Sequence, residues 1–335
     1  MATFKIYKLH FSSPLHISNQ HDEDDVSLNT IHSDTLYAAL TSCLAKVGKD
    51  IPDDGDLGFT ISSLFPYYQK DEDSSPVYFL PMPLQARQLS LEDVSMAKKV
   101  KKLKWVDLSL YDRILAGEGI SDYISYIQEA YLTKASLPMS VDGSCEFVRS
   151  EVSPRVTLKS RTGEEDAKPY YVDKIIFKDY SGLYFVAEGD TSKLEEALQF
   201  LSLEGIGTDR NVGYGFFDYT SDEISIELPQ DADHQLALSL LIPESERQLR
   251  QLMDSDKVAY DFIRRGGWIT TYPYNKLRKN AIYGFLPGSV FRRTSDESCP
   301  PIGKVVNLQP EIGELTPAHP VWRCGRSIML PIKQK

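Results

Sequence analysis

Cysteine motifs and membrane-length apolar runs are both absent from this sequence. The four cysteines, Cys43, Cys145, Cys299 and Cys324, lie far apart and form no CxxC pair. We therefore expect neither a zinc site of common spacing nor a disulfide framework. The first residues lack a signal-peptide pattern, and no apolar run approaches the length that spans a membrane. The sequence thus predicts a cytoplasmic protein with reduced thiols and no membrane association.

Histidine is scarce and shows no metal-binding or catalytic pattern. The six histidines include no HxH, HxxxH or HExxH spacing. GxSxG is absent too, and no cysteine has an evident histidine partner. We therefore predict no metal, no cofactor and no catalytic residue. His32 directly precedes a predicted helix N-terminus, which favours an anion such as phosphate, but one histidine is insufficient to indicate an enzyme.

Positive charge is in the minority, because the formal net charge is −11. This balance argues against a uniformly phosphate-binding surface. The acidic residues concentrate in predicted loops, whereas the basic residues form separate clusters that could follow a nucleic-acid backbone. A charged run is also the ordinary appearance of a solvated face, so the clusters alone leave both interpretations open. The basic clusters are Lys98–Lys104, Arg264–Arg265, Lys276–Lys279 and Arg292–Arg293.

The chain is long enough for two domains, and the pattern of the first is ferredoxin-like. An alternating strand precedes a helix that we expect Ser33 to cap, and two strands, a second helix and a strand follow an irregular stretch. The order β-α-(insertion)-β-β-α-β is that of the split βαβ arrangement, shared by RNA-recognition folds. The predicted strands are 4–11, 170–178, 183–188 and 214–219, and the predicted helices are 33–47 and 190–203, the latter with a Ser192/Glu195 capping pair.

The same pattern recurs more weakly after Asp222, where a second helix is not evident. We predict an α+β fold of tandem ferredoxin-like (RRM-like) βαββαβ domains. The first covers 1–221 and includes a large insertion at about 50–170, and the second covers 222–335. The predicted elements of the second domain are strands at 235–242, 260–270, 281–285, 289–293 and 326–332, and a helix at 244–253.

Glycine is concentrated in the stretch GIGTDRNVGYGFF, where Gly205, Gly207, Gly213 and Gly215 surround Arg210. The order helix, glycine-rich loop, strand is the reverse of the strand–loop–helix order of nucleotide-binding motifs, so neither a dinucleotide fingerprint nor a P-loop fits. Glycines let a backbone take positive φ and approach a ligand closely, with N–H groups free for an anion. A helix cap followed by a hairpin turn would have the same composition, so both interpretations stay open.

A long hairpin is predicted over 154–172. Arg155, Thr157, Lys159 and Arg161 fall on one side of its alternating first strand and give it a polar, basic face. An ordinary solvent-facing hairpin would show the same pattern.

Taken in order, these segments resemble the RAMP superfamily of CRISPR proteins, whose glycine-rich loop has the form GIG…GYG. They are most similar to subunit four of type III-A (Csm) effector complexes, and the RRGGWI segment favours type III-A over type III-B. The resemblance spans almost the whole chain. The matching segments are IHSDTL at 31–36, RVTLKSRTG at 155–163, the loop at 205–215, RRGGWI at 264–269, GSVF at 288–291 and CGRSIMLPI at 324–332.

The resemblance implies a structural RNA-binding subunit without a catalytic centre of its own. It implies that the chain grips the repeat-derived 5′ handle of the CRISPR RNA beside the large palm-domain subunit and the first backbone RAMP subunit. The implied RNA-binding residues are His32, Ser33, Arg155, Lys159, Arg161, Gly205, Gly207, Arg210, Gly213, Tyr214 and Gly215.

Two alternatives remain open on the same resemblance. One is the handle-binding subunit of a type III-B complex. The other is a metal-independent endoribonuclease of the superfamily, which would process repeat RNA through a histidine near the first helix. His32 is the residue that supports the enzyme, and no lysine or tyrosine partner for it can be placed from the sequence.

Overall fold

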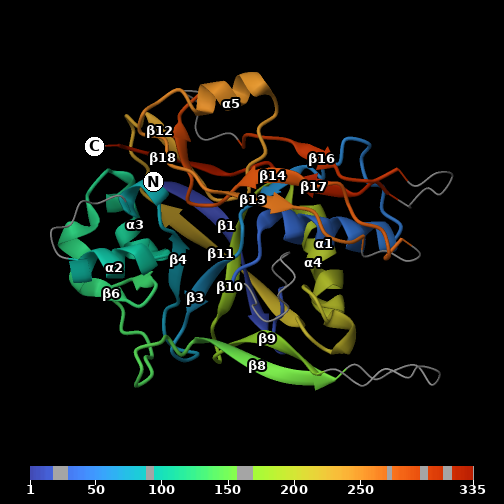
Figure 1. Ribbon diagram of the computed structural model, residues 1–335, viewed down its shortest axis with the longest axis horizontal. Coiled ribbons are helices and arrows are strands. Elements are labelled where there is room, and N and C mark those ends of the chain that lie inside the picture. The colour runs from blue at the N-terminus through green and yellow to red at the C-terminus, as the bar shows by residue number, and fades with distance from the viewer. Residues whose placement is uncertain are drawn as a thin grey trace.

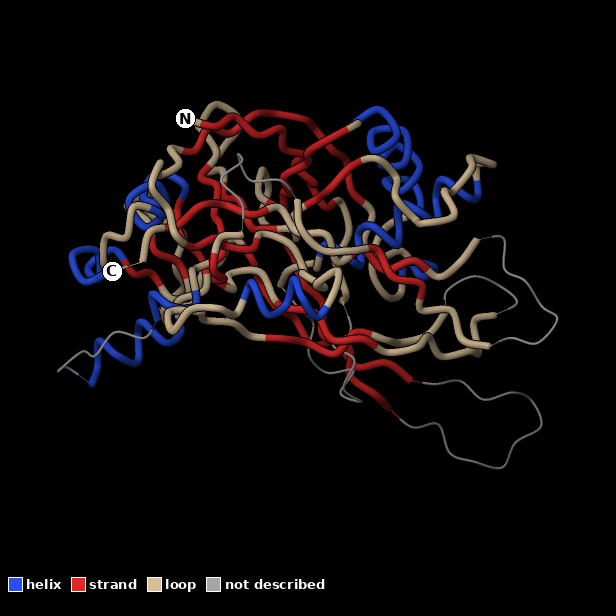
Figure 2. Tube along the Cα trace, turned by 90° about the horizontal axis from the view of Figure 1, so that it is seen from above, coloured by secondary structure: helices blue, strands red, loops and turns tan. Residues whose placement is uncertain are grey.

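A large, mostly antiparallel sheet lies at the centre of the molecule (Figure 1). The computed structural model describes residues 1–17, 29–87, 94–156, 169–269, 274–294, 301–311 and 319–334. Within these ranges the central sheet has nine strands. Figure 2 shows the strands gathered in the interior and the helices at the periphery. The α+β class is therefore as predicted.

The middle of this sheet combines the first strand of the chain with two strands that follow about 180 and 215 residues later. Strand β1 (Ala2–Phe11) pairs antiparallel with β10 (Gly182–Gly189) on one side and with β11 (Phe217–Ile226) on the other. Helix α1 (Ser33–Lys46) follows β1, and helix α4 (Thr191–Glu204) connects β10 to β11. The predicted positions are confirmed for β1, β10, α1 and α4, whereas the strand predicted at 214–219 begins at Phe217 and continues to Ile226.

Both faces of the sheet are covered, which explains why its central strands are apolar on both sides. On β1, Tyr7 and Leu9 pack with the buried leucines of α1 and α4. Phe4 and Ile6 point to the opposite face and pack with residues from the C-terminal part of the chain. Side chains alternate along a strand, so each strand contributes to two hydrophobic clusters.

Six short strands of the region predicted as an insertion belong to the central sheet, and two of them pair directly with β10. Strands β2 (Phe59–Ile61) and β3 (Phe65–Tyr68) both pair with β10. The prediction failed here because every residue of both strands is buried, so no polar–apolar alternation marks them. The sheet continues through β4 (Val77–Pro81), β5 (Trp105–Asp107), β7 (Tyr131–Leu132) and β6 (Ile127–Gln128). The helical elements of this region are η1 (Leu84–Arg87), α2 (Val94–Lys102), α3 (Leu108–Leu115) and η2 (Ile120–Tyr126).

The hairpin predicted over 154–172 is confirmed, and its two strands are longer than predicted. Strand β9 (Pro169–Phe177) pairs over its whole length with β8 (Val148–Val156) rather than with β10. Residues 148–153 lie outside the predicted hairpin but continue the same register with β9. The two strands lie together at the lower edge of the molecule in Figure 1.

Two predicted helix caps are also wrong. Position 32, not Ser33, is the N-cap of α1, and its side chain makes no capping hydrogen bond. Helix α4 is capped by Asp190, whose carboxylate accepts the Ser192 N–H at 3.0 Å. Glu195 binds Lys5 and Tyr7 across the sheet instead of closing a capping box.

The C-terminal part of the chain packs on the second face of the central sheet. Its three-stranded sheet contributes Leu236, Val290 and Leu330 to the same cluster as Ile6. The predicted boundary between 221 and 222 falls inside β11. The elements are η3 (Arg210–Val212) before β11, then β12 (His234–Ala237), α5 (Glu246–Leu252), β13 (Phe262–Arg265), β14 (Ile282–Phe285), β15 (Val290–Arg292), β16 (Val305–Asn307), β17 (Trp322–Cys324) and β18 (Met329–Ile332).

Among the described residues this part contains no second large sheet. Strand β12 pairs with β15 and β18, while β13–β14 and β16–β17 form separate two-stranded ribbons. None of the helices that the structure describes has both the length and the apolar character required to cross a bilayer.

Candidate nucleic-acid interface

The glycine-rich loop connects α4 to β11 and turns sharply at each of its glycines. The φ angles of Gly205, Gly207, Gly213 and Gly215 are 76°, 102°, 96° and 73°. Residues other than glycine rarely adopt such φ angles. The backbone conformation of the loop therefore favours glycine at these four positions. Asp209 also has a positive φ of 63°.

Three of the four glycines are required by packing within the protein. A β-carbon on Gly207 would lie 2.5 Å from the carbonyl oxygen of His16, and one on Gly205 would lie 2.8 Å from the carbonyl oxygen of Tyr214. One on Gly215 would overlap the carbonyl of Ile206. Gly213 differs, because a β-carbon there would have no neighbouring atom within 4 Å among the described residues. We expected all four glycines to leave room for a ligand. Among the described residues, Gly213 leaves that room and the other three glycines do not.

The loop is tied to the segment that follows β1. The Thr208 N–H donates to the carbonyl of His16 at 2.8 Å, and the Gly215 N–H donates to the carbonyl of Pro14 at 2.9 Å. The buried ring of His16 lies 2.6 Å, through Nδ1, from the carbonyl oxygen of Asp173 in β9. The loop, the segment after β1 and the hairpin thus form one hydrogen-bonded unit, which we call the loop–hairpin unit.

Arg155 joins the hairpin directly to the loop. Its Nη1 atom lies 2.6 Å from Oδ2 of Asp209, and its guanidinium lies 5.0 Å from the centre of the Tyr214 ring. Both charged side chains are about three-quarters buried. The structure therefore brings together the predicted residues Arg155 and Tyr214, but the charge of Arg155 is already balanced by a carboxylate.

Arg210 is held more loosely than Arg155. It lies in the short helix η3 at the outer turn of the loop, with Nη1 3.9 Å from Oε2 of Glu204. Glu204 accepts a closer contact, at 2.6 Å, from Lys46. The neighbouring Val212 is 59% exposed, so this turn faces solvent. The other two basic residues predicted on the hairpin, Lys159 and Arg161, lie outside the described residues.

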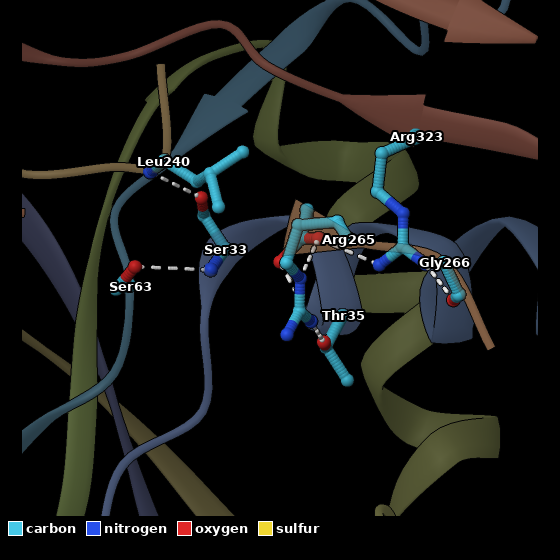
Figure 3. A network of polar contacts seen from close by, with 8 residues as sticks. Ser33, Thr35, Ser63, Leu240, Arg265, Gly266 and Arg323 are labelled. Atoms are coloured by element: carbon cyan, nitrogen blue, oxygen red, sulfur yellow. Dashed lines mark hydrogen bonds and ion pairs between the residues drawn. The ribbon is translucent and has the colours of Figure 1, made fainter. Parts of the chain in front are cut away.

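Ser33 is buried, and both its hydroxyl and its N–H have hydrogen-bond partners within the protein. Its hydroxyl accepts the Leu240 N–H at 2.9 Å, and its own N–H donates to Oγ of Ser63 at 3.0 Å (Figure 3). These bonds connect the start of α1 to the central sheet and to the C-terminal part. The prediction that Ser33 contacts RNA is therefore not supported by its position.

His32 is also buried, with 9% of its surface exposed. Its Nδ1 atom has no hydrogen-bond partner within the described part of the chain. Burial, followed by the charge of Arg265, lowers the pKa of His32 to about 4, so the ring is neutral near pH 7.

Asp34 is the centre of a buried ion network that the sequence analysis missed. Its carboxylate accepts from Nε of Arg265 at 2.7 Å and from Nη1 of Arg323 at 2.6 Å. Arg265 also donates to Oγ1 of Thr35, and Arg323 donates to the carbonyl of Gly266, as Figure 3 shows. The network joins α1 to β13 and β17.

The network contains two arginines but one carboxylate. Burial opposes ionisation of Asp34, but the charges of Arg323 and Arg265 outweigh it and hold its pKa below the ordinary value. Burial, with the charge of Arg323, lowers the pKa of Lys279 to about 8. One carboxylate therefore serves two guanidiniums with a further lysine nearby. The Arg264–Arg265 pair was the available sequence signal, but nothing in the sequence connects it to Asp34.

The comparisons with known proteins agree on one family. Residues 230–332 match the family model of the CRISPR Csm4 C-terminal domain. A Mycobacterium tuberculosis protein named CRISPR system Cms protein Csm4 is 26% identical over 322 residues, which cover 90% of each chain. A Thermococcus onnurineus protein of the same name is 26% identical over 255 residues, covering 70% of this chain and 74% of the relative.

Solved structures share the fold over nearly the full length. A chain from the Csm3–Csm4 subcomplex of the type III-A CRISPR-Cas interference complex matches with a TM-score of 0.61 and 16% identity, covering 98% of this chain and 99% of the other. A chain from a Csm1–Csm4 cassette in complex with pppApA matches with a TM-score of 0.59 and 19% identity, covering 100% and 99%. The family match, the curated relatives and the fold thus agree that this chain is similar to Csm4 proteins of CRISPR systems.

Proposed function

We propose that this chain is the non-catalytic subunit that binds the 5′ handle of the CRISPR RNA in a cytoplasmic type III-A effector complex. In that complex it would bridge the large palm-domain subunit and the backbone subunits. The solved chains that share this fold come from assemblies of Csm4 with Csm1 or with Csm3. Assemblies with two different subunits support a bridging position for this chain.

The loop–hairpin unit carries the proposal. It holds a turn at a fixed position on the surface, with Gly213 in open space and Arg210 loosely paired beside it. An RNA phosphate can approach a backbone closely where no side chain intervenes, and an arginine recognises it through two N–H groups. Arg155 fixes this turn from the hairpin through Asp209 and Tyr214.

We also propose that the chain contains two ferredoxin-like units. The first would comprise β1, α1, β2–β3, β10, α4 and β11, whose order along the sheet is β11-β1-β10 followed by β2 and β3. The second would be a reduced unit built around β12, β15 and β18, with α5 as its helix.

The position of His32 favours the binding role over the endoribonuclease. A general base works best when its pKa lies near the operating pH. The pKa of His32 is lowered to about 4, and the side chain is buried beside two arginines. Both features make it a poor acceptor for a proton from an RNA hydroxyl.

The test is co-expression of the chain with the products of its neighbouring genes and a CRISPR array, followed by sequencing of the co-purified RNA. Wild type should carry RNAs that share one 5′ handle. Gly213→Val adds a branched side chain at the open turn, so the RNA content of the purified assembly should fall.

Gly143→Val is the matched control. Gly143 also has a positive φ, 82°, and a β-carbon there would have no atom of the described residues within 4 Å. It lies in a different loop. Both substitutions introduce a similar backbone strain of about 1–3 kcal/mol. An assembly with Gly213→Val that retains as much handle RNA as Gly143→Val would remove the glycine-rich loop from the RNA site.

A further inference from the structure

The β13–β14 ribbon presents aromatic rings to solvent on the C-terminal part of the chain. Phe262 is 55% exposed and Tyr283 is 59% exposed, and their rings meet edge to face with centroids 5.8 Å apart. Trp268, which is 51% exposed, pairs with Arg278 across the continuation of the same hairpin. The guanidinium of Arg278 lies 4.8 Å from the centre of the indole. Burial does not explain these three rings, since each keeps about half of its surface in water.

Arg265, which follows the exposed Arg264, anchors the ribbon to the rest of the protein. Along β13, Arg265 points inward and binds the buried Asp34, whereas Arg264 is exposed and stands opposite Tyr283. Alternation along the strand therefore separates an internal anchor from an external face. A face anchored in this way is preorganised, which lowers the cost of binding a ligand.

The cations of this face lack carboxylate partners. Arg264, Lys276 and Arg278 are exposed, and no Asp or Glu oxygen lies within ion-pair distance of them in the part of the chain that the structure describes. Some other exposed arginines are paired, such as Arg250 with Glu246 and Arg292 with Asp254. Although the chain has a net charge of −11, these cations, which have no described carboxylate partner, and the three exposed rings form a surface that is locally basic and aromatic.

A nucleic acid fits this combination better than a protein partner does. The centre of a protein interface is depleted in charged residues, and lysine in particular is depleted there. Covering three unpaired cations with the charge-depleted centre of a protein interface would remove their water without supplying an opposite charge. Phosphates supply that charge, and bases stack on exposed aromatic rings without needing a defined sequence.

We propose that Phe262, Arg264, Trp268, Lys276, Arg278 and Tyr283, hereafter the ribbon face, bind an unpaired RNA segment. Bases would stack on the three rings and phosphates would lie near the three cations. The inference rests on the proposed function in that it takes RNA as the ligand of this chain. It adds a contact surface separate from the glycine-rich loop.

The test measures binding of fluorescein-labelled oligouridylate to the purified full-length chain. Phe262→Ala, Trp268→Ala and Tyr283→Ala should each weaken binding by about 5-fold or more, because stacking on one ring contributes about 1–3 kcal/mol. Tyr283→Phe should bind like wild type, since the ring remains. Tyr126→Ala is the matched control, because Tyr126 is an exposed ring with Lys134 over it elsewhere on the surface.

A second measurement observes Trp268 directly. Trp322 is buried and Trp105 is half-buried, so stacking of a base should quench mainly the fluorescence of Trp268. Quenching by oligouridylate in wild type should disappear in Trp268→Phe, whose retained ring should preserve most of the affinity. Unchanged quenching in Trp268→Phe would overturn the inference, and circular dichroism would verify that each variant is folded.

The outcomes separate this inference from the proposed function. If the assembly with wild-type chain carries handle RNA and the three alanine variants bind oligouridylate as tightly as Tyr126→Ala does, the ribbon face is not an RNA surface but the proposed function stands. If those variants keep RNA and lose the large subunit, the ribbon face is a protein-docking surface and the inference is wrong. If wild type carries no handle RNA in any assembly, the proposed function itself fails.

Discussion

Asp34 shows how much one side chain can determine in this protein. It is completely buried, and it is the carboxylate that both Arg265 and Arg323 contact. Removing one partner of a buried ion pair is far more costly than removing a surface pair, because the remaining charges stay buried without compensation. Here the remaining charges would be two guanidiniums.

We expect Asp34→Asn to lower the free energy of unfolding by about 3–5 kcal/mol, although the side chain keeps its shape. This is a large fraction of the stability of an ordinary domain. Urea denaturation measures it. Glu246→Gln is the control, since Glu246 and Arg250 form an exposed pair whose loss should cost about 0.3–0.5 kcal/mol. Equal losses in the two variants would contradict the importance of the buried network.

His32 predicts a pH dependence that can be isolated from other groups. Its pKa is about 4 in the folded chain against 6.5 for the unperturbed side chain. Unfolding therefore takes up a proton between these values, and the stability should fall as the pH is lowered from about 6.5 to about 4. The slope from this one group is at most about 1.4 kcal/mol per pH unit.

His32→Gln removes this titration while keeping a polar side chain of similar size. The difference in stability between wild type and His32→Gln should change across this interval and be constant above pH 7. Chemical denaturation at several pH values provides the measurement. A difference that stays constant over the whole range would show that the ring titrates normally.

At the scale of secondary-structure elements, the hairpin and the glycine-rich loop act as one unit. Their connection through Arg155 admits two roles for this arginine: it positions the loop, or it binds a phosphate itself. The two roles predict opposite effects of removing Asp209. If Arg155 positions the loop, Asp209→Asn weakens RNA binding; if Arg155 binds phosphate, Asp209→Asn frees it and strengthens binding.

We expect the positioning role, because Asp209 lies 2.6 Å from Arg155 and Tyr214 covers the guanidinium. Arg155→Ala and Asp209→Asn should each weaken handle binding by a similar factor, and the double variant should lose little more. A hydrogen bond to a charged group is worth about 1.5–3 kcal/mol, so the effect should be about 10-fold or more. Tighter RNA binding by Asp209→Asn would assign Arg155 to the ligand instead.

The elements that the sequence predicts best are those with a strong local signal. Helices α1 and α4 have leucines at helical spacing, and β1 alternates, so their positions were predicted to within a few residues. The hairpin of β8 and β9 was predicted from alternation near its tip, but the first residues of β8 were not recognised as part of it. Strands β2 and β3 are short and completely buried, so their pattern resembles irregular apolar chain.

The site residues also differ in whether a local sequence signal marks them. The glycine-rich loop was recognisable because its residues are contiguous. The bond from Arg265 to Asp34 spans 231 residues of sequence and that from Arg323 spans 289, so neither could be predicted from spacing. The expectation that Ser33 caps α1 failed because its hydroxyl has a partner in the C-terminal part, Leu240, that only the folded chain supplies.

At the scale of the whole molecule, the two parts of the chain share one hydrophobic cluster. Ile6 and Val186 of the central sheet pack in the same cluster as Leu236, Val290 and Leu330. A cluster that both parts complete does not permit one part to unfold while the other remains native.

We therefore expect the full chain to unfold in one cooperative transition. Tryptophan fluorescence and far-ultraviolet circular dichroism should give the same midpoint. A fragment of residues 1–229 lacks both arginines that bind Asp34 and exposes the second face of the central sheet. It should bind a hydrophobic dye and lack a cooperative transition, whereas a stable fragment with a sharp transition would show that the N-terminal part folds independently.

The shared carboxylate also sets a rule for recombination between relatives. A chimera joined between β11 and β12 takes Asp34 from one parent and both arginines from the other. Such an exchange should yield a folded protein when the second parent carries cations at the two matching positions. Where the second parent lacks these cations, an apolar substitution at Asp34 should restore folding. Compatibility between the two parental parts therefore depends on three buried side chains, which a comparison of surfaces would not reveal.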